Sequence, residues 1–349
     1  MKRLTAILMV LGLLLALGCE NVTDPSSEVL DQTEDNAAEL AKERADALEE
    51  QQELEQQREL EERVANYRVV LSKRSAEATF QGSKITVPDD FATVQDAINA
   101  AAPGTKIKIK DGHYTQALTI TTDDLEISGE GDVILQGGIT ISNTSGVELT
   151  NLDIRRFGGS AAADAVIIVN SSDITIKDNI IFGADDGVRM NSSTECLIKG
   201  NTIEGRRGEG VKLNSGSDDN VVEENTITTG SASGDEGVEL NSADNNEIAD
   251  NVINAPSDDA IELNNSDGNE ISGNIIDSPD YEGVDLDNSD NNEVKDNEIS
   301  NAGDDGIEID SASENNEIIK NVVCGSANQN IDNNDPTTVL KKNETGPCN

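Results

Sequence analysis

The sequence predicts an all-β solenoid, a right-handed parallel β-helix of about ten coils, because three signals repeat in phase. The first is an Asn-x-Ile or Asn-x-Val step every 22 to 26 residues, at Asn179, Asn201, Asn225, Asn251, Asn274, Asn297 and Asn321. The second is an acidic residue before Gly or Ala and then Val or Ile, at Asp186, Glu209, Glu236, Asp259, Glu282 and Asp305. The third lies five residues before each later Asn, at Cys196, Asn220, Asn246, Asn269, Asn292 and Asn316.

This period indicates coils that bury one another's apolar faces. Leucine-rich repeats have a similar period, but they need a Leu-rich signature, and Leu is scarce in these repeats. Three short strands per coil with Asn at the corners fit a right-handed parallel β-helix. We expect these asparagines to adopt the left-handed backbone of tight corners and to hydrogen-bond from coil to coil.

The N-terminus resembles an export signal, which we assign to residues 1–18. Lys2 and Arg3 precede an apolar run from Leu4 to Leu17 that is too short to span a membrane. The run ends in Leu-Ala-Leu-Gly-Cys, which resembles the lipobox of bacterial lipoproteins. That resemblance implies cleavage before Cys19, lipidation of Cys19, attachment to the membrane through the lipid, and a place in the cell envelope, as an outer-membrane lipoprotein that is periplasmic or surface-exposed.

Two segments separate the lipid anchor from the solenoid. Residues 19–27 form a polar linker, and residues 28–76 are rich in Ala, Glu, Gln, Leu and Arg without Gly or Pro, which predicts a helical stalk. Apolar residues with coiled-coil spacing occur only near its end, from Leu60 to Leu71. The stalk is therefore either a solvated spacer or an oligomerisation helix that makes the protein a homo-oligomer.

Residues 77–104 are predicted to cap the β-helix, which then occupies residues 105–349. Thr93 and Asp96 resemble a capping box at the start of a short helix, and Pro103 and Gly104 end that helix. Alternating apolar residues beyond it, such as Ile107 and Ile109, predict the first strands of the solenoid.

Composition excludes several functions. The 349 residues include 69 acidic and 25 basic side chains, for a formal net charge of -44. This excess of negative charge argues against a nucleic-acid partner, because phosphates need Lys and Arg. A single His and four Cys argue against a zinc site or a His-based catalytic triad.

Residues 84–349 resemble the right-handed parallel β-helix repeat proteins of the pectin-lyase-like superfamily. Ile85-Thr86-Val87-Pro88, the Val94–Ile98 helix and Gly112-His113-Tyr114 resemble the family's N-terminal cap and first coil, and the coils are similar to NosD-type repeats. The resemblance implies the fold. It does not imply one activity, because the superfamily contains lyases, hydrolases, esterases, epimerases and members without known chemistry.

One charged cluster is the candidate for catalysis, as a polysaccharide lyase or glycoside hydrolase: Asp185, Asp186, Arg189, Glu209 and Lys212. Asp185-Asp186-Gly187, like Asp304-Asp305-Gly306, resembles the paired aspartates of polygalacturonases, where carboxylates act as acid and base. However, the Gly-His-Gly and Arg-x-Lys motifs of that family are missing, and the acidic residue recurs in every coil as a structural element would. These points favour the alternative, which is charge pairing that interrupts an otherwise acidic face.

The acidic repeats need counter-charges. From residue 214 onward there are 33 acidic and 4 basic residues, and like charges about 4.8 Å apart in water repel by about 0.9 kcal/mol before screening. We expect weak, diffuse binding of calcium or other cations along Glu236, Asp259, Glu282 and Asp305. No other cofactor is expected.

Two cysteines near the C-terminus, Cys324 and Cys348, are predicted to form a disulfide that holds the tail over the last coil. Cys196 occupies a position of the asparagine repeat and is expected to be a buried small apolar residue.

These signals favour a non-catalytic, lipid-anchored β-helix that presents an acidic face for adhesion or for weak binding of polysaccharide or cations. The alternatives are a carbohydrate-active enzyme centred on Asp185 to Lys212, and an envelope scaffold that assembles through the stalk.

Overall fold

The computed structural model describes residues 83–348, apart from residues 158–162, 231–234 and 255. The predictions for the signal peptide, for Cys19 and for the stalk at residues 28–76 lie outside the described residues. Within the described part, no helix is long and apolar enough to cross a membrane.

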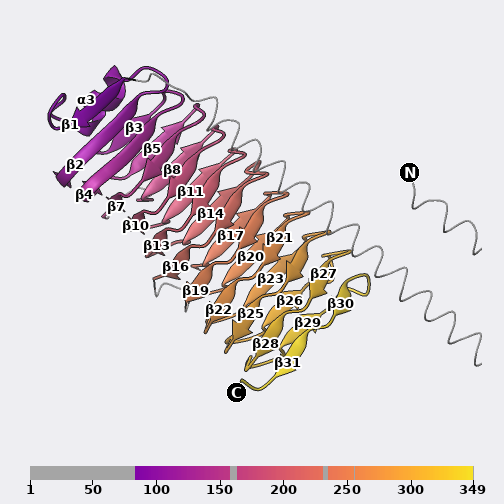
Figure 1. The fold of residues 1–349 in the computed structure, drawn as a ribbon. Coiled ribbons are helices and arrows are strands. Elements are labelled where there is room, and N and C mark those ends of the chain that lie inside the picture. Colours follow the sequence, from indigo (N-terminus) through magenta and orange to yellow (C-terminus); the bar gives the residue numbers. More distant parts are fainter. Residues whose placement is uncertain (1–82, 158–162, 231–234, 255, 349) are drawn as a thin grey trace, which may run out of the picture. The chain divides into compact units, whose positions relative to one another are not determined.

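The described residues form a right-handed parallel β-solenoid of about 11 turns, with three strands in each complete turn (Figure 1). One strand of each turn belongs to a ten-stranded sheet. Its strands are β3 (Leu118–Ile120), β5 (Ile139–Ser142), β8 (Val166–Val169), β11 (Val188–Asn191), β14 (Val211–Asn214), β17 (Val238–Asn241), β20 (Ile261–Asn264), β23 (Val284–Asp287), β26 (Ile307–Ile309) and β29 (Ile331–Asn333).

The next strand of each turn belongs to what we call the first series, in which each strand pairs in parallel with the equivalent strand of the following turn. It comprises β1 (Lys84–Val87), β2 (Lys106–Tyr114), β4 (Glu126–Gln136), β6 (Glu148–Thr150), β9 (Thr175–Lys177), β12 (Leu197–Lys199), β15 (Val221–Glu223), β18 (Glu247–Ala249), β21 (Glu270–Ser272), β24 (Glu293–Lys295), β27 (Glu317–Ile319) and β30 (Val339–Lys341).

The third strand belongs to the second series, which begins with the ends of β2 and β4. It continues through β7 (Asp153–Arg155), β10 (Ile180–Gly183), β13 (Thr202–Gly205), β16 (Thr226–Thr229), β19 (Val252–Asn254), β22 (Ile275–Asp277), β25 (Glu298–Ser300), β28 (Val322–Cys324) and β31 (Glu344–Gly346). Because β2 and β4 run through both series, the two form one 21-stranded sheet.

Alternation along each strand builds the core. In β11, Val188 and Met190 are buried, whereas Arg189 and Asn191 between and after them point outward. The same inward position is repeated from turn to turn, so Ile203 pairs in register with Ile227, which pairs with Ile253. The core is therefore a stack of Ile, Val and Leu, each contributing roughly 1.5–3 kcal/mol on burial.

The predicted capping helix is present as α3 (Val94–Ala100), which packs against β1, β2 and β3 near the N-terminal end of the solenoid. The Thr93 side chain accepts a hydrogen bond from the backbone N–H of Asp96 and caps the helix. Val94, Ala97 and Ile98 are buried on one face, as their spacing predicts.

Two asparagine ladders connect the turns, and one part of the prediction for them was wrong. The ladder asparagines are buried, and the Oδ1 of each accepts from the backbone N–H of the equivalent residue one turn earlier, as Asn251 does from Asn225 at 3.0 Å. The left-handed backbone belongs to the preceding residue instead, such as Glu224 or Asp250. In each corner, a residue with a left-handed backbone reverses the chain direction, and the side chain of the asparagine after it points inward and hydrogen-bonds to neighbouring coils.

The cysteine predictions are confirmed. Cys324 and Cys348 form a disulfide, and Cys196 is a buried free cysteine whose backbone N–H donates to Asn220 Oδ1 at 3.0 Å. Burial raises the pKa of the Cys196 thiol to about 12, so this thiol is held protonated and unreactive.

Candidate functional site

Two rows of charged residues run along the outer side of the ten-stranded sheet. We call one the strand column: its members are in register on successive strands, namely Arg189, Lys212, Glu239, Glu262, Asp285 and Glu308. The other, the turn column, contains the acidic residue two positions before each strand: Asp164, Asp186, Glu209, Glu236, Asp259, Glu282 and Asp305. The strand column stacks because the repeats of the sequence are in phase.

The turn column is largely buried, which the repeat pattern did not indicate. Asp186, Glu236 and Asp259 are all more than nine-tenths buried. The aspartates of this column accept hydrogen bonds from the next coil: Asp186 Oδ1 from the Glu209 N–H at 3.2 Å, and Asp259 Oδ1 from the Glu282 N–H at 2.8 Å. Asp305 Oδ1 accepts from the Gln329 N–H at 2.6 Å in the same way. These carboxylates therefore join successive turns.

The structure brings the five residues of the candidate catalytic cluster together, but each one contacts its own neighbours. Arg189 Nε donates to Asp186 Oδ2 at 2.6 Å, and Arg189 Nη2 lies 3.3 Å from Asp164 Oδ1. Asp185 accepts from the Ala163 N–H at 2.7 Å through Oδ2 and pairs with Arg207 through Oδ1 at 3.0 Å. The acidic and basic groups of the cluster thus satisfy one another.

Lys212 is held between two carboxylates of the columns. Its Nζ lies 2.9 Å from Glu209 Oε1 and also contacts Glu239 Oε2. Burial opposes the charged form of Lys212, but the hydrogen bonds and charges of the two glutamates outweigh it and raise the pKa of the lysine above its ordinary value. A lysine held cationic in this way is a poor general base.

Beyond Lys212, the strand column contains carboxylates in place of cations. Carboxylate oxygens gather in three groups, with the oxygens of each group within 4.8 Å of one another. The groups are Glu209, Glu236 and Glu239; Asp259, Glu262 and Asp285; and Glu282, Asp305 and Glu308. The four residues predicted to bind cations each belong to one of these groups. Three carboxylates at this separation match the oxygen donors that calcium prefers.

Burial and like charge raise the pKa of several of these carboxyls into the neutral range or above. Burial, together with the nearby Glu282, raises the pKa of Asp259 to about 10. Burial and the charges of Glu308 and Glu282 raise the pKa of Asp285 to about 8. Burial and neighbouring glutamates likewise raise the pKa of Glu236 to about 8. Near pH 7 the carboxylate groups therefore retain protons unless a cation takes their place.

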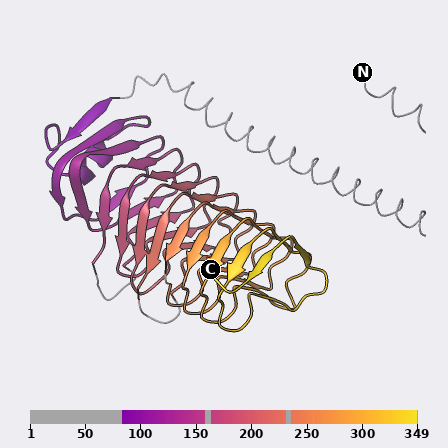
Figure 2. The ribbon, with the colours of Figure 1, turned by 60° about the horizontal axis from the view of Figure 1, so that its bottom comes forward.

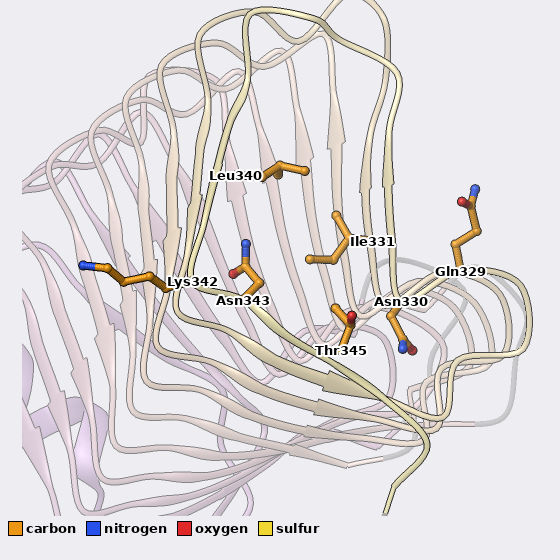
Figure 3. Close-up of a pocket in the computed structure, with 7 residues that line it drawn as sticks. All are labelled: Gln329, Asn330, Ile331, Leu340, Lys342, Asn343 and Thr345. Carbon is orange, nitrogen blue, oxygen red and sulfur yellow. The ribbon is translucent and has the colours of Figure 1, made fainter. Parts of the chain in front are cut away.

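No residue of the two columns lines either of two hollows in the described surface. One is at the open end of the last turn, where Ile331, Leu340, Asn343 and Thr345 line it together with Gln329, Asn330 and Lys342 (Figure 3). The other follows the turns after the first strands of the ten-stranded sheet, from Asp123 to Thr194. No residue of the catalytic candidate lines either hollow.

Sequence reasoning missed Asp164 as the first member of the turn column. Its Oδ1 accepts from the Asp186 N–H at 3.2 Å and pairs with Arg189, and the carboxylate is almost fully buried. Asp164-Ala165-Val166 lies 22 residues before Asp186-Gly187-Val188 and has the same acidic-small-Val pattern. Extending the repeat by one period toward the N-terminus would have found it.

A family model described as a right-handed β-helix region matches residues 68–228 and 186–340. These matches cover most of the chain, and they agree with the handedness and the parallel register of the structure. The chain belongs to the right-handed β-helix family. In this chain, the carboxylate groups lie on the outer side of the ten-stranded parallel sheet.

Two individual proteins are similar to about a third of this chain. The SHC SH2 domain-binding protein 1 of Homo sapiens is 27% identical over 128 residues, which are 35% of this chain and 19% of that protein. A polygalacturonase of Penicillium janthinellum is 31% identical over 113 residues, which are 32% of this chain and 26% of the enzyme. The chain thus spans about a fifth to a quarter of these relatives' length.

Solved structures share the fold at low identity. The A-module of the mannuronan C-5 epimerase AlgE4 of Azotobacter vinelandii superposes with a TM-score of 0.57 and 18% identity, covering 77% of this chain and 94% of the module. At this identity the likeness shows the β-helix alone.

Proposed function

We propose that this β-helix is a non-catalytic protein of the cell envelope, lipidated at Cys19, that binds calcium or similar cations on its acidic sheet. Through the bound cations it holds acidic polysaccharide. The observation that carries this proposal is the change within the strand column, from Arg189 and Lys212 to four successive carboxylates.

In the two columns, the first turns contain cationic side chains, and the later turns contain carboxylates alone. Arg189 lies between Asp164 and Asp186, and Lys212 lies between Glu209 and Glu239. Two periods further on, the equivalent space is bordered by Asp259, Glu262 and Asp285, without a cationic side chain in the group. A divalent cation there would supply the charge that the ammonium supplies two turns earlier, because buried carboxylates need a partner.

A cation bound to three carboxylates would still accept ligands from outside. Calcium takes six to eight oxygen ligands, so carboxylates or hydroxyls of a polysaccharide can complete its shell. The repeat of these groups along the sheet suits a polymer with regularly spaced charges. Once one contact has formed, the next charge of the polymer is held near the next group, so several weak contacts give a higher overall affinity. The polygalacturonase relative is consistent with a carbohydrate ligand.

The competing function is a carbohydrate-active enzyme at the Asp185 to Lys212 cluster. One observation favours it: burial and the nearby Glu209 raise the pKa of Asp186 to about 8, as a general acid requires. Against it, Asp186 already accepts hydrogen bonds from the Glu209 N–H and from Arg189 Nε. Asp259 and Asp305 make the same coil-to-coil bond elsewhere in the repeat.

The first experiment is a calcium titration of the full chain by calorimetry at pH 7.5. The second measures how much of the chain is retained by an immobilised polyuronate, in calcium and in chelator. Glu262→Gln together with Asp285→Asn should weaken calcium binding at least tenfold and abolish calcium-dependent retention of a polyuronate. The matched control is Glu314→Gln, which removes an exposed carboxylate outside the groups and should behave as the wild type.

Equal calcium binding in the double variant and in the control would refute the proposal. New reducing ends or unsaturated products from a polysaccharide panel, lost in Asp186→Asn or Lys212→Ala, would instead establish the enzyme.

A further inference from the structure

Lys212 occupies one of the three carboxylate groups. Glu209, Glu236 and Glu239 form the first of these groups along the chain, and we call it the first group. Lys212 Nζ lies 2.9 Å from Glu209 Oε1 and also contacts Glu239 Oε2. All three glutamates are more than nine-tenths buried, and buried carboxylates need a positive partner. The first group therefore already binds a cation, and that cation is part of the chain.

The ammonium matches only part of the first group. Of the described cationic side chains, none forms an ion pair with Glu236. Burial and the neighbouring glutamates raise the pKa of Glu236 to about 8, so this carboxyl keeps its proton near neutral pH. A calcium ion has twice the charge of the ammonium and takes six to eight oxygen ligands, so it can bind all three carboxylates at once.

The spacing of the oxygens in the first group suits a metal ion. Three atoms within 4.8 Å of one another all lie within about 2.8 Å of one common point, and calcium–oxygen bonds are about 2.3–2.6 Å long. A small movement of the flexible glutamate side chains closes this difference. The first group thus has the oxygen donors and the size of a calcium site, with an ammonium inside it.

The third group, formed by Glu282, Asp305 and Glu308, repeats the first group except at the lysine. Both groups contain the turn-column residues of two successive turns and the strand-column residue of the second turn. The strand-column residue of the first turn is Lys212 beside the first group and Asp285 beside the third. This one position of the repeat therefore decides whether the chain supplies a cation or a further carboxylate.

We propose that Lys212 is a built-in counter-ion that closes a calcium site, and that the first group binds calcium once this ammonium is removed. The sites that are open to cations in the natural chain then begin beyond Lys212. This inference rests on the proposed binding of cations by the later groups. It goes beyond that function because it assigns a further site and the residue that closes it.

Calorimetric titration of the full chain with calcium chloride at pH 7.5 tests the proposal. Lys212→Met keeps an unbranched side chain but removes its charge, and it should bind one more calcium ion per chain than the wild type. The matched control is Lys199→Met. Lys199 Nζ also lies 2.8 Å from two glutamates, Glu223 and Glu224, but these belong to none of the three groups. The control should bind the same number of ions as the wild type.

Thermal unfolding gives a readout that does not depend on counting ions. In chelator, Lys212→Met should melt about 5 °C or more below the wild type, because Glu209 and Glu239 lose their counter-charge. Millimolar calcium should restore most of this loss, since an ion that binds only the native state stabilises it. The melting temperature of Lys199→Met should differ from that of the wild type equally in calcium and in chelator.

The reciprocal substitution keeps the proposal testable if Lys212→Met does not fold. Asp285→Lys places an ammonium at the equivalent position of the repeat, beside Glu282 and Glu308, and adds a counter-charge to the sheet. It should bind at least one calcium ion fewer than the wild type. It should also melt at a higher temperature than the wild type in chelator.

The outcomes separate this inference from the proposed function. Equal numbers of bound ions in the wild type and in Lys212→Met would overturn the inference and leave the proposed function in place. Binding by Lys212→Met alone would support the inference and refute the proposed function, and no binding by either would overturn both. A further ion bound by Lys199→Met, or an unchanged number in Asp285→Lys, would also overturn the inference.

Discussion

The buried ladder asparagines hydrogen-bond to the backbone and to the side chains of neighbouring turns. Asn251 donates from Nδ2 to the Val222 carbonyl at 2.8 Å and to Asn274 Oδ1 at 3.1 Å. Its own Oδ1 accepts from the N–H and the side chain of Asn225. One amide therefore connects three turns of the chain, and no hydrophobic residue of similar size can replace it.

Asn251→Ala should lower the free energy of unfolding by about 3 kcal/mol or more, because the Val222 carbonyl and the Asn225 N–H would remain buried without partners. Urea denaturation followed by circular dichroism measures the change. Asn214→Ala, at an outward and half-buried position of β14, should cost less than about 1 kcal/mol. A similar loss in both variants would show that the ladder bonds contribute little.

The acidic columns make the ten-stranded sheet sensitive to pH. The pKa values of Asp259, at about 10, and Asp285, at about 8, are raised above those of unfolded carboxyls near 4. The native state therefore binds more protons than the unfolded state between these values, and stability falls as the pH rises through this window. Cations that replace the protons should reduce the loss.

In chelator, we expect the melting temperature to fall between pH 5 and pH 9 by more than about 5 °C. Millimolar calcium should remove most of this fall, and calcium binding should release protons at pH 7. Asp259→Asn should flatten the pH dependence, because it replaces the carboxyl with the most strongly raised pKa. A melting temperature that rises with pH in chelator would contradict the role assigned to the columns.

The strands and their register could be predicted from the sequence, because the Asn-x-Ile steps and the acidic-Gly-Val steps recur in phase. The stacking of Arg189 on Lys212 follows from that phase alone. The burial of Asp186 and Asp259 could not be predicted, since it depends on how each corner brings the carboxylate under the next coil. For the same reason, the left-handed backbone was wrongly predicted for the ladder asparagines. It belongs to the residues that precede them, such as Asp250.

The whole solenoid depends on contacts between neighbouring turns, as expected of a repeat protein. The described residues pair in parallel from β1 to β31, and each strand contacts its equivalents in the adjacent turns (Figures 1 and 2). Stability should therefore be close to a sum over turns. We therefore expect that removal of one complete turn leaves the remaining turns with equivalent neighbours.

Deletion of residues 252–274 removes one turn and joins Asn251 to Ile275, which restores an Asn-Ile step. The shortened chain should fold, with a cooperative transition and a strand content lower by about one turn in circular dichroism. Deletion of residues 252–263 removes only half a turn and should prevent folding of the following coils, because inward and outward positions no longer match. If both deletions fold equally well, the turns are not the units of stability.

The hydrogen bonds that the Oδ1 atoms of the asparagine ladder accept from the backbone all point the same way, from a backbone N–H to the Oδ1 of the following coil. During synthesis from the N-terminus, the last coil to have folded would consequently always have a ladder N–H that still lacks its Oδ1 acceptor. Each newly made coil supplies the Oδ1 acceptor for the coil before it and presents its own N–H to the next coil. Assembly in the order of synthesis is therefore built into the direction of these bonds, and an interruption of translation would leave a correctly wound but open-ended fragment.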